Sequence, residues 1–144
     1  MKSQLFEYLE SRFGILPPKF KDFEFYGASR GRIFLGPKHI ISRPEPVSVG
    51  ILAARTGNAI KPTTNLLQLF GRHASKNIVN LNKENIMKYA KGESLLLTEQ
   101  EKNSSSNGYV IVSYSSVPVG CGYLKDDSLD SLLPKAKRLS LKYL

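Results

Sequence analysis

Short apolar runs separated by turn residues fill the second half of the chain, and this spacing constrains the fold more than any other feature. Strand candidates precede the tail at Ile78–Val79, Leu95–Leu97, Tyr109–Tyr114 and Val117–Leu124. Only Ser115 and Ser116 separate the last two, which indicates a tight β-hairpin. The tail residues Leu139, Leu141 and Tyr143 alternate as in a final strand. One helix among five short strands predicts a small β-barrel.

The helix predicted inside this barrel has a signal at each end. Asn82 is a good N-cap, and Glu84 places a negative charge in the first turn, where it suits the helix dipole. An apolar face follows, and Gly92 ends the helix. Gly92 has two interpretations, because a C-cap glycine needs no function, whereas a residue without a side chain also lets a phosphate approach the backbone.

The first half begins with a predicted helix that carries Leu5, Phe6, Leu9 and Phe13 on one stripe. Ser3 is a candidate cap for its start, and a glycine ends it in the left-handed conformation. Phe23–Phe25 and Ile33–Leu35 predict a hairpin with aromatic faces. Val47–Ala54 predicts a more central strand, and Asn65–Phe70 predicts a short helix capped by Thr63 or Thr64.

The two halves differ in their pattern of apolar and turn residues, and we predict a boundary near Gly71. The expected fold class is α+β, with a small α/β lobe at residues 1–71 and a small β-barrel at residues 72–144. Each lobe is small for a domain, so we expect the two to pack together.

The charge of the chain points to a polyanionic partner. With 21 Lys and Arg against 12 Asp and Glu, the net charge is +9. From Phe25 to Lys83 a single acid, Glu45, lies among nine basic residues, and no acid follows Ser131. Such a distribution is typical of a nucleic-acid-binding surface. A solvated face, an acidic protein partner and anionic lipid are the alternatives.

Membrane and secretory functions are not expected. The longest apolar stretch, Val49 to Ala54, is far shorter than a membrane span, and acids interrupt the N-terminal apolar stretch, unlike in a signal peptide. The single cysteine suits a reducing cytoplasm and excludes an internal disulfide.

Residues that support catalysis, cofactor binding or metal binding are few. The segments Gly27–Gly31 and Gly120–Gly122 lack the spacing and the following helix of a nucleotide-binding loop. Cys121 lies in an apolar strand, distant in sequence from His39 and His73, so we expect an inert thiol. The acids Asp126, Asp127 and Asp130 indicate a polar turn with a helix-capping role. We therefore expect no enzyme, no cofactor and no metal.

The stretch from Gly108 to Arg138 resembles a known family. It reads GYVIVSYSSVPVGCGYLKDDSLDSLLPKAKR and is similar to the end of a PUA domain, a small RNA-binding pseudobarrel. It looks most like the PUA-type C-terminal domain of the Sun/Fmu group of rRNA cytosine methyltransferases. Upstream, Lys61 to Asn82 is similar to a segment of small archaeal relatives of that group. The catalytic region of those enzymes has no counterpart here, since a cofactor glycine loop and a Pro-Cys pair are both absent.

The resemblance implies RNA binding without chemistry, on structured rRNA or tRNA, in ribosome biogenesis, rRNA processing or RNA modification. It places the RNA face on the helix, the glycine turn after it and the last strand: Lys88, Lys91, Gly92, Lys135, Lys137 and Arg138. Residues before the barrel extend this surface: Arg72, His73 and Lys76. For His73, a phosphate or base contact and a purely structural role are both open. A secondary basic surface comprises Arg30, Arg32, Arg55 and Lys61.

A second class of function also fits the sequence. A basic adaptor of this size would dock on an RNA methyltransferase or on a ribosomal protein. Salt dependence of RNA binding separates the two classes, because phosphate contacts release counterions.

Overall fold

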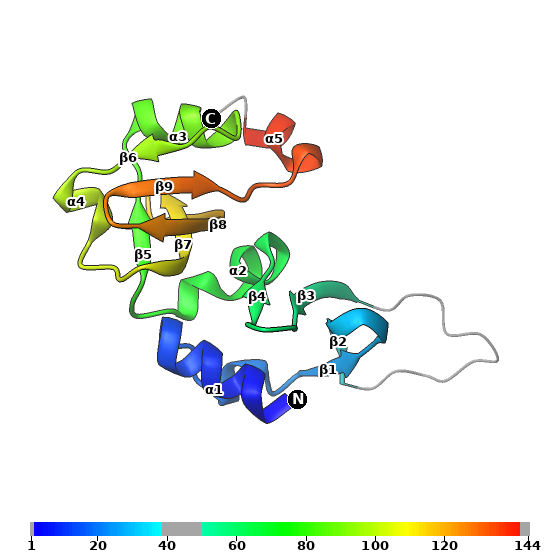
Figure 1. Ribbon diagram of the computed structural model, residues 1–144. Helices are drawn as coiled ribbons and strands as arrows, with labels where there is room; N and C mark the ends of the chain where they lie inside the picture. Colours follow the sequence, from blue (N-terminus) through cyan, green and yellow to red (C-terminus); the bar gives the residue numbers. More distant parts are fainter. Residues whose placement is uncertain (1, 39–49, 142–144) are drawn as a thin grey trace.

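The computed structural model describes residues 2–38 and 50–141, and the strands of these ranges form two sheets (Figure 1). The first sheet is four-stranded and antiparallel, in the order β1-β2-β3-β4. Its strands are β1 (Phe23–Gly27), β2 (Arg32–Pro37), β3 (Ile51–Arg55) and β4 (Lys61–Pro62). The second sheet has the order β5-β7-β8-β9-β6. Its strands are β5 (Ile78–Asn80), β6 (Leu95–Leu96), β7 (Gly108–Tyr114), β8 (Val117–Lys125) and β9 (Ser128–Ser131).

Helices connect and cover the two sheets (Figure 1). They are α1 (Lys2–Phe13), α2 (Thr64–Phe70), α3 (Lys83–Ala90), α4 (Glu99–Lys102) and α5 (Lys135–Leu141), with three short 3-10 turns, η1 (Pro17–Phe20), η2 (Ser29–Gly31) and η3 (Gly71–His73). None of the helices in the described ranges is long and apolar enough to cross a lipid bilayer.

The first helix forms as its stripe predicts. Leu5, Leu9 and Phe13 recur every four residues and are fully buried, and Gly14 ends the helix at a φ of +70°. The helix already includes Lys2, so the prediction that Ser3 caps it is wrong, and Ser3 lies in the first turn.

The second sheet is buried on both faces, which explains the continuous apolar run in β7. Ile111 and Cys121 join the core formed with α1, α2 and the first sheet. Val110 and Val112 point the other way, into a second core beneath α3. The predicted hairpin is confirmed, with both Ser115 and Ser116 at positive φ, the geometry of a type I′ turn.

The α+β class is confirmed, with an antiparallel first sheet and a curled second sheet, but the chain end differs from the prediction. The tail forms helix α5 in place of a final strand, because Pro134 cannot donate to a strand ladder and is followed by strong helix formers. The Lys137 N–H donates to the Pro134 carbonyl at 2.9 Å, which begins the helix. Strand β9 completes the sheet, and we did not predict it.

Several other predictions have an outcome in the described residues. The acids Asp126 and Asp127 form the turn between β8 and β9, and Asp130 lies in β9, so the helix-capping role is wrong. Thr63 is the cap of α2, with its side chain accepting from the Leu66 N–H at 3.3 Å. Predictions outside the described residues concern His39, Glu45, Val47–Val49 and Tyr143.

Candidate nucleic-acid interface

The C-terminus of α3 is a complete glycine cap. The Gly92 N–H donates to the Tyr89 carbonyl at 2.9 Å, and the Glu93 N–H donates to the Lys88 carbonyl at 3.1 Å. Gly92 has a φ of +82°, so this pair of bonds forms a Schellman motif. The cap interpretation of Gly92 is therefore confirmed by geometry, and it leaves Lys88 and Lys91 exposed at the end of the helix.

Helix α5 brings a third basic side chain to this position. Arg138 Nε donates to the Leu133 carbonyl at 3.2 Å, and α5 packs against α3. The Arg138 guanidinium fills the space over Gly92, where a β-carbon would overlap it. The open space expected above the Gly92 backbone therefore holds a cation, and a phosphate at this point would meet the guanidinium.

We call the group around Gly92 the helix-end surface, and it comprises Lys88, Lys91, Gly92, Lys135 and Arg138. Lys135 is exposed in the first turn of α5. Lys137 faces another way, because its Nζ donates to Gln68 Oε1 on α2 at 3.2 Å. Gln68 in turn donates to the Val119 carbonyl at 2.9 Å, so this chain of bonds holds α5 and α2 to the second sheet.

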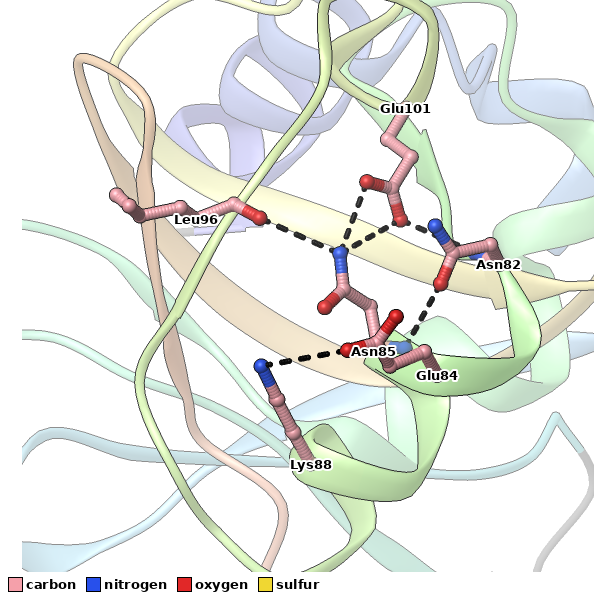
Figure 2. A network of polar contacts seen from close by, with 6 residues as sticks. All are labelled: Asn82, Glu84, Asn85, Lys88, Leu96 and Glu101. Carbon is pink, nitrogen blue, oxygen red and sulfur yellow. Dashed lines mark hydrogen bonds and ion pairs between the residues drawn. The ribbon is translucent and has the colours of Figure 1, made fainter.

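A buried carboxylate holds the start of α3 in place (Figure 2). Glu101 is 5% exposed and accepts from the Asn82 N–H at 3.0 Å and from Asn85 Nδ2 at 2.9 Å. Asn82 also caps the helix, with its Oδ1 accepting from the Asn85 N–H at 2.8 Å. Burial alone would raise the pKa of Glu101, but the bonds from Asn82, Thr98 and Asn85 outweigh it and lower the pKa. The carboxylate thus stays ionised as an internal brace.

The surface of α3 carries one weak ion pair. Lys88 Nζ lies 4.0 Å from Glu84 Oε1, one turn earlier on the helix, and both side chains are exposed (Figure 2). Exposed pairs of this kind contribute a few tenths of a kcal/mol, about 0.3–0.5. Lys88 is therefore readily available to an external anion.

Arg72, His73 and Lys76 lie apart from the helix-end surface. The N–H groups of Ser75 and Lys76 donate to the Phe13 carbonyl at 2.8 and 3.3 Å, so this segment sits at the end of α1. Helix α1 packs on one face of the second sheet, whereas α3 covers the other face, with α5 beside it (Figure 1). Arg72 Nε donates to His73 Nε2 at 3.4 Å. Burial lowers the pKa of His73, and the charges of Lys19 and Arg72 lower it further, which favours the neutral imidazole.

The secondary basic residues form a third group at one end of the first sheet. Arg32 is opposite Arg55 in the β2–β3 register, and Arg55 is opposite Lys61 in the β3–β4 register. Arg30 lies in the adjoining η2 turn. The predicted basic residues are thus distributed over three groups, with Lys137 apart from all three on the side of α2, and no single surface contains them all.

The residues considered for catalysis have structural roles. Burial raises the pKa of the Cys121 thiol to about 12, as for an inert thiol. A β-carbon at Gly120 would overlap the Tyr89 hydroxyl, which donates to the Cys121 carbonyl at 2.8 Å, so the glycine makes room for a buried tyrosine. Within residues 2–38 and 50–141, no group of three or more His, Cys, Asp or Glu side chains is placed to hold a metal ion.

Comparisons with known proteins identify the family of the second half of the chain. Residues 76–139 match the family described as the methyltransferase RsmF PUA domain. Residues 76–139 form a PUA domain. The structure titled "Structure of a Conserved PUA Domain Protein from Thermoplasma acidophilum" aligns with a TM-score of 0.56 at 14% identity, over 98% of this chain and 81% of that chain. This likeness shows a shared fold. No curated protein matches the sequence.

Several residues near the basic side chains were not predicted. Gln68 holds Lys137, and Lys19 lies near enough to His73 to lower its pKa. These relationships join segments that are distant in the sequence, and no local pattern indicates them. Tyr26 and Phe34 on the first sheet were predictable, because both lie at the strand positions that alternate with the buried side chains.

Proposed function

We propose that this chain is a non-catalytic RNA-binding protein that acts on structured rRNA or tRNA in the cytoplasm, in ribosome biogenesis or RNA modification. The observation that carries the proposal is the helix-end surface of the PUA domain. Lys88, Lys91 and Lys135 are exposed there, around an arginine held over Gly92.

The chemistry of this surface suits a phosphate backbone. Lysine side chains act as flexible point charges, whereas Arg138 is fixed by its bond to Leu133 and presents a planar guanidinium. Contacts of this kind position a protein on RNA and carry little sequence information. Double-stranded RNA is recognised largely through its shape, phosphates and 2′-hydroxyl groups, so a structured RNA fits the surface better than a sequence motif does.

A basic adaptor that docks on an RNA-modifying enzyme or a ribosomal protein is the second candidate. Leu96 favours it, because this side chain is 75% exposed on β6, an edge strand of the second sheet. An exposed apolar side chain on an edge strand is a common protein-docking feature. Removing the helix-end cations separates the two candidates. An RNA-binding protein would lose affinity for RNA, whereas an adaptor would lose affinity for its protein partner.

Fluorescence anisotropy with labelled bulk tRNA tests the proposal. Lys88, Lys91 and Lys135 are changed together to Ala, and the matched control changes the exposed Lys21, Lys38 and Lys125 to Ala. Both variants lose three charges. We expect the first to weaken binding at least about tenfold at 0.1 M salt, and the control to lose much less. Equal losses would refute a localised RNA site, and tRNA that fails to bind the unmodified protein would refute the proposal.

The proposed function requires no cofactor and includes no chemical reaction. Gly120–Gly122, the nearest sequence to a nucleotide loop, lies within strand β8 and precedes no helix. Calorimetric titration with S-adenosylmethionine should therefore give no binding heat. Micromolar binding would overturn the non-enzymatic part of the proposal and leave RNA binding as a separate question.

A further inference from the structure

The first sheet has a solvent-facing side that the PUA domain does not use. Phe25, Ile33 and Leu35 are buried against the helices. Side chains alternate across a strand, so Tyr26 and Phe34 lie on the opposite face, where each is half-buried. These two residues are directly opposite each other in the β1–β2 register. The Tyr26 hydroxyl donates to the Pro37 carbonyl at 3.1 Å, which fixes its ring across the pair of strands.

A row of cations crosses the end of this sheet. Arg32, Arg55 and Lys61 are consecutive partners across β2, β3 and β4. Like charges directly opposite each other destabilise a sheet. Among the described residues, none of these three cations forms an ion pair, and Glu24, the one acid in the strands of this sheet, lies at the far end of β1. The row therefore creates a positive potential that no neighbouring acid of the described ranges balances, and an external anion would lower the repulsion between the three cations.

The row borders an open pocket of about 450 Å³ lined by Ser29, Arg30, Arg32 and Arg55. Arg32 is held at its rim, since its Nε donates to the Ser29 carbonyl and its Nη2 donates to Ser29 Oγ, both at 3.0 Å. Arg30 has a φ of +62°, a conformation that non-glycine residues rarely adopt. Three guanidinium groups around one pocket that contains no acid match the charge and the hydrogen-bonding needs of a phosphate.

The pocket and the aromatic residues meet at Arg32. Its guanidinium carbon lies 5.6 Å from the centre of the Phe34 ring, a cation–π distance. The planar guanidinium and the ring beside it offer stacking surfaces for a nucleobase next to the phosphate pocket. Charge alone would suit any polyanion, whereas a pocket for phosphate beside aromatic rings suits a nucleic acid.

We infer that this side of the first sheet, the arginine face (Tyr26, Ser29, Arg30, Arg32, Phe34, Arg55 and Lys61), binds a single-stranded segment of RNA. A backbone phosphate enters the pocket, and an unpaired base stacks on Arg32 and Phe34. The inference rests on the proposed function and extends it. The PUA domain holds structured RNA at the helix-end surface, and the arginine face takes an unpaired region of the RNA.

The probe for the arginine face is a fluorescein-labelled uridine decamer, which has no stable secondary structure. Arg32→Gln with Arg55→Gln should weaken its binding about tenfold or more and flatten the log–log salt slope by about 1.4, the value for two phosphate contacts on a single strand. The control Lys21→Gln with Lys38→Gln loses the same charge at exposed sites and should leave the slope nearly unchanged. Phe34→Leu retains every charge and should weaken binding about fivefold or more, since stacking on a base is worth about 1–3 kcal/mol.

A second measurement does not depend on variants that fold. In the unmodified protein, the decamer should shift the NMR signals of the Arg32 and Arg55 Nε–H groups and of the Phe34 ring, while those of Lys135 and Arg138 move less. The inference would be overturned if Arg32→Gln, Arg55→Gln and Phe34→Leu left the affinity for the decamer unchanged and the decamer shifted none of these signals.

The outcomes separate this inference from the proposed function. If tRNA binds through the helix-end surface and the decamer does not bind, the arginine face inference fails and the proposed function stands. If neither RNA binds, both fail. If a polyglutamate peptide displaces the decamer and Phe34→Leu has no effect, the arginine face is a site for an acidic protein, and the RNA inference is overturned.

Discussion

The guanidinium of Arg138 lies directly over the backbone of Gly92, in the space that a side chain at residue 92 would occupy. This contact joins the end of α3 to α5 and converts a helix cap into part of a basic surface. It also explains why glycine suits this position in two ways, because the Schellman geometry needs a positive φ and the arginine needs the space.

Gly92→Ala should therefore reduce both stability and RNA binding. The left-handed conformation costs an alanine about 1–2 kcal/mol, which urea unfolding at pH 7 would measure. The added methyl group displaces the Arg138 guanidinium, so tRNA affinity should fall severalfold in the same preparation.

Gly57→Ala is the matched control for this substitution. A β-carbon at Gly57 would meet nothing within 4 Å, and its φ lies outside the strained region. Its stability and tRNA affinity should stay close to those of the unmodified protein. An alanine at residue 92 that behaves like the alanine at residue 57 would contradict the role of the Arg138–Gly92 contact.

Glu101→Gln should destabilise the PUA domain in a pH-dependent way. Glutamine turns one acceptor oxygen into a donor that faces the donors of Asn82, Asn85 and Thr98, at a cost of roughly 2–3 kcal/mol at pH 7. Because folding lowers the pKa of Glu101, its contribution to stability is present above the unfolded-state pKa and is lost as pH falls through the folded-state pKa.

Urea unfolding between pH 3 and pH 7 follows this effect. The difference in unfolding free energy between the unmodified protein and Glu101→Gln should shrink as the solution is acidified. Glu93→Gln changes an exposed carboxylate and should alter stability by less than about 0.5 kcal/mol. A pH-independent difference for Glu101→Gln would show that the ionised carboxylate is not the brace.

Residues 72–144 contain the whole second sheet, and the boundary at Gly71 stays a prediction. The fragment retains the core beneath α3, but it loses the partners of Ile111 and Cys121 on the other face of the sheet. We expect it to fold, with a lower melting temperature than the full chain. Circular dichroism that shows no cooperative unfolding transition would mean that the two halves fold only together.

Local signals identified the elements that depend on neighbouring residues in the chain. Asn82 and Thr63 cap the helices that their positions predict, and the Ser115–Ser116 turn has the predicted tight geometry. Strand β9 was missed because its four residues, Ser128–Ser131, include three polar side chains and are recruited by pairing with β8. The alternation of Leu139 and Leu141 misled in the other direction, since helix propensity after Pro134 outweighed a weak period-two pattern.

The kind of residue that forms the candidate site was predictable from the sequence, but the grouping of these residues in space was not. The basic residues were evident from their excess over acids, but which of them meet depends on the packing of distant elements. Gly92 and Arg138 are brought together by the α3–α5 contact, and Lys137 is diverted to Gln68 on α2. No sequence spacing encodes those contacts, because they arise only when both cores are assembled.

The salt dependence of tRNA binding tests the central claim most directly, since counterion release measures phosphate contacts without knowledge of the natural RNA. We predict a log–log slope of about −3 to −5 for the unmodified protein, from roughly four to six contacts. Replacing Lys88, Lys91 and Lys135 by Ala should flatten the slope by about two, while the Lys21, Lys38 and Lys125 control retains it. A slope near zero for the unmodified protein, or one that the helix-end substitutions leave unchanged, would contradict RNA binding at the helix-end surface.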